Sequence, residues 1–144
     1  MMVRDQQHID GALVSRTQAV GVDSKALIVG LLGQTDDCVK LLGLEGTLDF
    51  MNCNGLEAME IGDFAQVSGR LWWDLWPEEE RPRLRSLFDR ALAGHESQFK
   101  AFCPTALGTP KHWRIRLSPM TSHTGVVVGV MFSSRELRAE PGPA

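Results

Sequence analysis

The chain lacks the cysteine spacing that a zinc or thiol-disulfide site requires. Its 144 residues contain three cysteines, Cys38, Cys53 and Cys103, which are far apart and form no Cys-x-x-Cys pair. The four histidines are equally dispersed and show no ligand spacing. We therefore expect three reduced thiols, as in a cytoplasmic protein, and no metal site.

Long apolar runs, runs of one charge and catalytic motifs are also missing. The longest apolar run, Ala26 to Gly33, is far too short to cross a membrane, and the N-terminus has no signal-peptide pattern. A net charge of −3 gives no general attraction to nucleic acid. There is no Gly-x-Ser-x-Gly elbow and no phosphate-binding loop. These absences predict a cytoplasmic protein that is not an enzyme and binds no nucleic acid.

What is present is the composition of one soluble domain. Hydrophobic residues make up 43% of the chain and charged residues 23%, which is ordinary for a globular protein. Residues 1–22 are weakly patterned, so we expect a flexible N-terminal segment there, a domain over 23–137 and a disordered tail over 138–144. A helix is expected at 24–33, although a buried strand is the competing interpretation of the same residues.

The first part of the domain predicts a hairpin and a short helix. Strands at 38–44 and 47–52 flank Glu45-Gly46, a two-residue turn in which glycine supplies the positive φ. Asn54 is then expected to cap a short helix, with Glu57 completing a capping box.

The second part predicts one long helix and three strands. The helix is expected from about Glu79 to Ala93, ended by Gly94, because its apolar residues recur with helical spacing. These residues are Leu84, Leu87, Phe88, Ala91 and Leu92. Strands follow at 97–103, 112–119 and 126–132, the last of them rich in β-branched residues.

The residues at the joints between these elements carry a family resemblance. Phe50-Met51-Asn52 closes the second strand, and Asp74-Leu75-Trp76-Pro77-Glu78 precedes the long helix. Ser134-Arg135-Glu136-Leu137 ends the fifth strand. In this order they resemble a PAS domain over roughly Asp23 to Leu137. The resemblance implies an α+β PAS fold, a five-stranded antiparallel sheet with short helices and one long helix packed on one face.

The resemblance also implies a function. PAS domains act as sensors or interaction modules in signal transduction, in proteins such as two-component histidine kinases and diguanylate cyclases. Their ligand lies in an apolar cavity between the sheet and the helices. We therefore expect a small-molecule ligand, an effector domain or partner protein, and a homodimer formed through the N-terminal helix.

Tryptophan clustering suggests the cavity wall. Three of the four tryptophans lie between Trp72 and Trp76, and an indole ring can stack on an aromatic ligand or simply fill the core. The expected ligand-binding residues are Asn52, Met59, Trp72, Trp73, Trp76, Phe88 and Trp113.

The cofactor expectations follow from the same resemblance. Haem-binding PAS domains commonly use a histidine of the long helix, and the long helix expected here contains no histidine. LOV photoreceptors use a cysteine at the place that corresponds to residues 69–73, which contain no cysteine. We expect no cofactor, with a non-covalent flavin as the alternative and haem disfavoured. Cys53, between Asn52 and Asn54, is interpreted as part of a structural joint and not as a reactive thiol.

Two other functions compete with a ligand sensor. The first is a ligand-free PAS dimerisation module whose interface is the apolar stripe Leu27, Ile28, Leu31 and Leu32. The second is a small enzyme on an isomerase-like α+β cone, which is disfavoured because such folds usually begin with helices.

Overall fold

The computed structural model describes residues 2–138, except for the side chains of residues 2–10 and of Cys53. The chain divides into two units, Met1–Thr35 and Asp36–Ala144. Apart from Arg138, the predicted tail over 138–144 therefore lies outside the described part, as does the predicted role of the Cys53 thiol. None of the helices within residues 2–138 is long and apolar enough to cross a membrane.

The first unit consists of two helices, α1 (Met2–Val20) and α2 (Ser24–Gln34). We expected a flexible segment over residues 1–22, and the structure has α1 there; the flexibility of this segment stays a prediction. In residues 24–33, where a helix competed with a buried strand, a helix forms. No residue of α2 is buried, so this segment does not have the surroundings that a buried strand requires.

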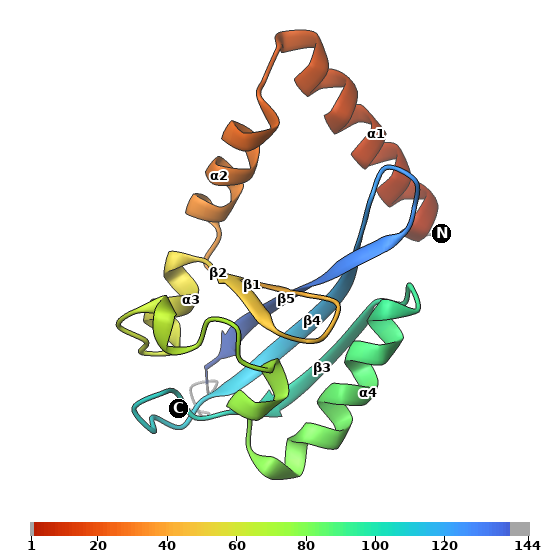
Figure 1. Ribbon diagram of the computed structural model, residues 1–144. Coiled ribbons are helices and arrows are strands. Elements are labelled where there is room, and N and C mark those ends of the chain that lie inside the picture. The colour runs from red at the N-terminus through yellow and green to blue at the C-terminus, as the bar shows by residue number, and fades with distance from the viewer. Residues whose placement is uncertain (1, 139–144) are drawn as a thin grey trace, which may run out of the picture. The chain divides into compact units, whose positions relative to one another are not determined.

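The second unit is built on a five-stranded sheet (Figure 1). Its strands are β1 (Cys38–Leu42), β2 (Leu48–Met51), β3 (Ser97–Phe102), β4 (His112–Thr121) and β5 (Val127–Leu137). Their order is β2-β1-β5-β4-β3, and every neighbouring pair is antiparallel. The predicted five-stranded antiparallel sheet is confirmed, and β5 runs past the β-branched stretch at 126–132 to Leu137, where the family resemblance placed its end.

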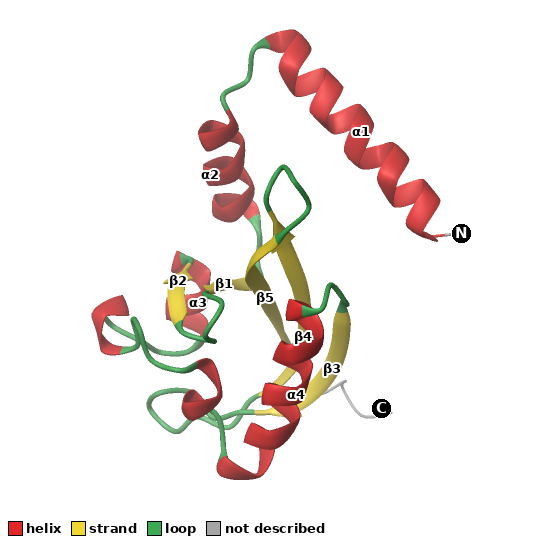
Figure 2. Ribbon diagram, turned by 45° about the vertical axis from the view of Figure 1, so that its right-hand side comes forward, coloured by secondary structure: helices red, strands yellow, loops and turns green. Residues whose placement is uncertain are grey.

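The helical segments of the second unit lie between β2 and β3 in the chain. They are α3 (Cys53–Ala58), three short 3₁₀ helices at Phe64–Gln66, Trp72–Leu75 and Glu78–Glu80, and α4 (Arg81–Leu92). Figure 2 shows α4 running across one face of the sheet. Its buried residues are Leu84, Phe88 and Ala91, the centre of the predicted apolar stripe. The regular helix begins two residues later than expected because Glu78–Glu80 forms a 3₁₀ turn first.

The β1–β2 turn requires glycine for two reasons. Gly46 has a φ of 87°, which residues with a side chain rarely adopt. A Cβ added there would also clash with the Trp73 ring. The predicted Glu45-Gly46 turn therefore also fixes the position of this tryptophan.

The face of the sheet under the helices carries the core. Lys40 of β1 lies opposite both Met51 of β2 and Phe132 of β5, and Phe132 lies opposite Leu117 of β4. Directly opposite residues share a face, so these four side chains form one row across four strands. All four are buried, and the row is apolar apart from Lys40.

Asn52 joins β1, β2 and α3. Its Oδ1 accepts from the backbone N–H of Val39 (3.0 Å) and of Gly55 (2.9 Å), and its Nδ2 donates to the carbonyl of Asp37 (3.1 Å). The N-cap of α3 is thus Asn52, and our prediction of Asn54 was wrong by two residues. The position of the cap depends on tertiary structure. Asn52 has the extended backbone of a cap, and its side chain also accepts a hydrogen bond from Val39 of β1.

We predict that Asn52→Ala lowers the free energy of unfolding by about 2–4 kcal/mol, because it leaves buried backbone N–H groups without an acceptor. Urea denaturation measures the change. Asp63→Ala is the matched control, since Asp63 caps an exposed 3₁₀ helix by one bond to Ala65. We expect about 1 kcal/mol or less for the control. Equal losses in both variants would contradict a special role for Asn52.

Candidate functional site

A cavity of about 330 Å³ lies between the row of sheet residues and the segments that connect β2 to α4. Its walls come from β1, β2, β4, β5, the Trp72–Leu75 helix and the β3–β4 loop. The large aromatic residues of the lining are Trp72, Trp76, Trp113 and Phe132. The cavity is therefore aromatic and lies in the core of the second unit.

Phe132 is the centre of an aromatic cluster on this wall. Its ring centroid is 4.8 Å from that of Trp72 and 6.5 Å from that of Trp76. Trp72 and Trp76 contact each other edge to face, with centroids 6.2 Å apart. These separations are typical of stabilising aromatic pairs, so the cluster is a preformed wall.

The predicted site residues divide between the cavity and the surrounding core. Met59, Trp72, Trp76 and Trp113 line the cavity. The other three predicted residues do not. Whether the lining residues bind a ligand stays a prediction.

The remaining three predicted residues have structural positions. Trp73 packs edge to face on Phe88, with ring centroids 5.7 Å apart, and covers the turn at Gly46. Asn52 is occupied by its three backbone contacts. Trp72 and Trp73 point in different directions because they are successive residues of a 3₁₀ turn, which the clustering in the sequence could not reveal.

The sequence analysis missed the polar residues of the lining. Lys40, Ser134, Cys103 and Thr105 are buried and line the cavity together. A signal for Lys40 was available: it alternates with Cys38 and Leu42, so in a strand the three side chains share one face. Because lysine is usually exposed, Lys40 was not predicted as a residue of the cavity lining.

Cys103 is held in its neutral form. Burial raises the pKa of its thiol from the ordinary 9.0 to about 11, against the opposing charge of Lys40. Since the thiolate is the nucleophile, this thiol is inert at neutral pH. It serves as a soft, uncharged part of the cavity wall.

The two lining tryptophans with the deepest burial differ in how their N–H groups are satisfied. Trp113 Nε1–H donates to the carbonyl of Cys103 at 2.9 Å, which fixes the ring. Trp72 Nε1 is the buried side-chain nitrogen for which the described residues supply no hydrogen-bond partner. Trp72 thus carries an unsatisfied donor in the wall.

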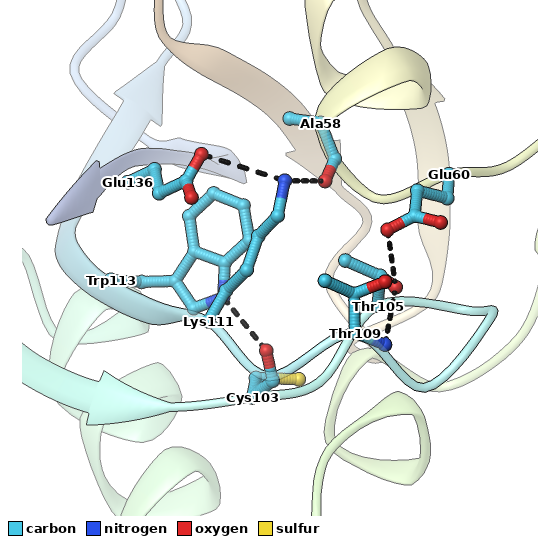
Figure 3. A network of polar contacts seen from close by, with 8 residues as sticks. All are labelled: Ala58, Glu60, Cys103, Thr105, Thr109, Lys111, Trp113 and Glu136. Carbon is cyan, nitrogen blue, oxygen red and sulfur yellow. Dashed lines mark hydrogen bonds and ion pairs between the residues drawn. The ribbon is translucent and has the colours of Figure 1, made fainter. Parts of the chain in front are cut away.

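Residues 103–106 of the β3–β4 loop line one side of the cavity. The loop is attached to the end of α3 by a set of polar contacts, called here the clip (Figure 3). Lys111 Nζ donates to the carbonyl of Ala58 at 2.9 Å and lies 3.4 Å from the Glu136 carboxylate. A second contact of the clip is the hydrogen bond that Thr105 Oγ1 donates to Glu60 Oε1 at 3.0 Å. The amide of Ala106 donates to the carbonyl of Met59 at 2.9 Å. The loop beside the cavity is therefore held to the end of α3 by polar contacts.

Glu60 has an unusual conformation at the centre of this clip. Its φ is 58°, the only positive value among the described residues other than glycine. Hydrogen bonds from the side chains of Thr109 and Thr105 lower the pKa of its carboxyl group, because they favour the charged form. The contacts of Thr109 and Thr105 with Glu60 are therefore strongest when Glu60 is ionised.

The lining contains no histidine, and no cluster of three His, Cys, Asp or Glu side chains suitable for a metal ion occurs in the described part of the chain. The side chains present offer aromatic faces, one buried lysine and hydroxyl groups. This set can bind an organic molecule by stacking and hydrogen bonding.

A family model described as the PAS fold matches residues 32–140. No curated protein matches the chain in sequence.

Three solved structures have a similar fold. The PAS domain of a protein from Colwellia psychrerythraea has a TM-score of 0.69 at 15% identity, covering 80% of this chain and 98% of that one. The PAS domain of an HTR-like protein from Haloarcula marismortui has a TM-score of 0.67 at 14% identity, covering 85% and 99%. The Vibrio cholerae VqmA dimer, described among LuxR-type receptors, has a TM-score of 0.66 at 15% identity, covering 78% and 51%.

We predict that the Glu60 clip is lost on acidification. Its contribution is fully present above pH 4.5 and is lost as the pH falls through the lowered pKa of Glu60. Amide NMR signals of Ala106 and Thr109, followed from about pH 6 to about pH 3, should report one transition below 4.5. In Glu60→Gln this transition should vanish, whereas it should persist in Glu57→Gln, an exposed change on α3. A transition unchanged in Glu60→Gln would contradict the assignment.

Proposed function

Because the chain belongs to the PAS fold family, we propose that it is a sensor module that binds a small molecule in its cavity and relays the bound state to an effector. PAS domains are generally sensory and not catalytic. The observation that carries the proposal is the cavity of about 330 Å³ behind the clipped loop.

The size of the cavity favours ligand binding over core filling. Protein interiors are close-packed and rarely leave voids larger than a water molecule, whereas ligand pockets start at about 300 Å³. Four aromatic side chains line this space without filling it. The family resemblance gives the same position for the ligand, between the sheet and the helices.

The relay is proposed to run through β5. This strand carries Phe132 and Ser134 in the cavity wall and continues to Glu136, which pairs with Lys111 of the clipped loop. A ligand that moves the wall can therefore alter both the loop and the end of the sheet. The effector is proposed to be a histidine kinase or cyclase domain, or a partner protein reached through a homodimer; VqmA, which has a similar fold, is described as a dimer and as a receptor with target DNA.

The ligand is proposed to be colourless, with a non-covalent flavin as the alternative. The aromatic walls are suited to stacking on a flavin ring, which would supply redox or light-driven chemistry when bound. Residues 69–73 carry no cysteine for a LOV-type adduct. An absorption spectrum of the purified protein distinguishes the two, since a flavin absorbs visible light.

We predict that indole, a neutral aromatic probe, binds in the cavity. It should shift the NMR signals of the tryptophan Nε1–H groups and slow hydrogen exchange in residues 103–106, because it fills the space that they line. It should also change exchange at the end of β5 or in the N-terminal segment, or change the dimer fraction. The proposal fails if indole and a flavin both leave all of these unchanged.

The matched controls are two tryptophan substitutions. Met59→Trp places extra volume at a half-buried lining position and should abolish indole binding. Val128→Trp adds a side chain of the same size at an exposed position of β5 outside the lining and should leave binding intact. Circular dichroism verifies that both variants fold.

A ligand-free dimerisation module is the second candidate function. It is favoured by α2, on which Ile28 and Leu31 are 56% and 60% exposed in residues 2–138. An exposed apolar stripe on a helix is typical of a surface that binds a partner.

We predict that Leu31→Asp converts a homodimer to a monomer, because it buries a carboxylate in an apolar interface. Light scattering after size-exclusion chromatography measures the mass. Ala26→Asp, on the opposite side of the same helix from the stripe, should leave the dimer intact. A dimer that survives Leu31→Asp would argue against this interface in either candidate function.

A further inference from the structure

Lys40 is the unusual residue of the cavity. It occupies the middle of β1, between β2 and β5, and only 5% of its surface is exposed. Lysine is almost never buried to this degree unless its charge is paired. The other charged residues of the lining, Arg70 and Asp74, are both exposed.

The contacts of Lys40 do not include a carboxylate. Its Nζ donates to the thiol of Cys38 at 2.8 Å and lies 4.3 Å from the centroid of the Phe132 ring. The ion pairs found in residues 2–138 involve other residues. A thiol is a weak acceptor, and an aromatic face compensates only part of the charge. A buried amine with three N–H donors therefore retains donor capacity.

The groups near Lys40 neither neutralise it nor exclude an acceptor. The Cys103 thiol stays uncharged, and Ser134 contributes a buried hydroxyl to the same lining. Trp72, which packs on the same Phe132 ring, holds the buried indole N–H that has no partner among the described residues. Donors are thus in excess over acceptors in this part of the wall.

We propose that the cavity takes a small organic anion, a monocarboxylate with an aromatic or aliphatic body, whose carboxylate pairs with Lys40. The proposal rests on the proposed function, since it names the ligand class of the same cavity. The body of the ligand lies against the aromatic cluster of Trp72, Trp76 and Phe132. The carboxylate supplies the counter-charge that the protein itself does not supply.

The charge and size of the site favour a carboxylate over a phosphate. A phosphate group carries nearly two negative charges and is normally held by several cations or by a series of backbone N–H groups. This wall offers one buried cation, which matches one carboxylate. A volume of about 330 Å³ is at the lower limit of ligand pockets and fits a small molecule.

The test compares two probes that differ in charge. Indole-3-acetate and indole-3-acetamide have almost the same shape, and only the first carries a carboxylate. We expect the wild-type protein to bind the acetate about tenfold to a hundredfold more tightly, because the acetate carboxylate forms an ion pair with Lys40, whereas the amide accepts only a hydrogen bond from it. Isothermal titration calorimetry measures both affinities.

The variants test whether Lys40 causes the preference. Lys40→Met keeps the apolar stem and removes the charge, so it should reduce the preference to about one while the amide still binds. Lys40→Gln is the second variant in case the first does not fold. Lys100→Met, the same change at an exposed position of β3, should keep the full preference.

The possible outcomes distinguish the anion proposal from the ligand-sensor function. A preference that is present in wild type and lost in Lys40→Met or Lys40→Gln supports the proposal. Equal binding of acetate and amide to wild type overturns it and leaves the ligand-sensor function standing. A preference that persists without Lys40 also overturns it. If neither probe binds, the anion proposal fails, and the ligand-sensor function fails with it only if indole and a flavin also leave the protein unchanged.

Discussion

The contact of Phe132 with the Trp72 and Trp76 rings is the interaction on which the cavity depends. Phe132 lies on β5, at the middle of the sheet, and the two tryptophans come from the segment before α4. Three large rigid rings, packed edge to face or tilted against one another, separate the two layers and leave space beside them. A cluster of smaller, branched side chains would let the layers collapse and fill that space.

Around this fixed wall, the opposite side of the cavity is held by polar contacts. The β3–β4 loop is attached to the end of α3 through Glu60 and Lys111, and Trp113 Nε1–H holds the beginning of the same loop at Cys103. The Glu60 and Lys111 contacts are partly buried and the Trp113 contact is buried. The cavity thus has one side formed by packed aromatic rings and another held by a few polar contacts.

The sequence predicted the fold well because local rules and the core agree there. The Glu45-Gly46 turn, the apolar stripe of α4 and Gly94 each have one favourable structure, and their order is characteristic of the family. The site was predicted less well. Trp72 and Trp76 line the cavity, but Trp73 covers the hairpin turn, since the direction of successive side chains in a short 3₁₀ helix depends on tertiary packing. Asn52, expected at the ligand, is used by the backbone of β1 and α3.

Lys40 shows why polar site residues are the hardest to find from sequence. In a strand, residue type alone suggests that lysine faces water, while its alternation with Cys38 and Leu42 places it on the inner face. Where two such rules conflict, the residue lowers the stability of the fold, and such conflicts are concentrated at functional sites. An unpaired buried charge is unfavourable until a counter-charge arrives. A ligand anion of the proposed kind would therefore stabilise the domain, since its charge would compensate for the desolvation of Lys40. Under the proposed function, occupancy of the cavity would then be coupled to the stability of the sheet through β1 and β5.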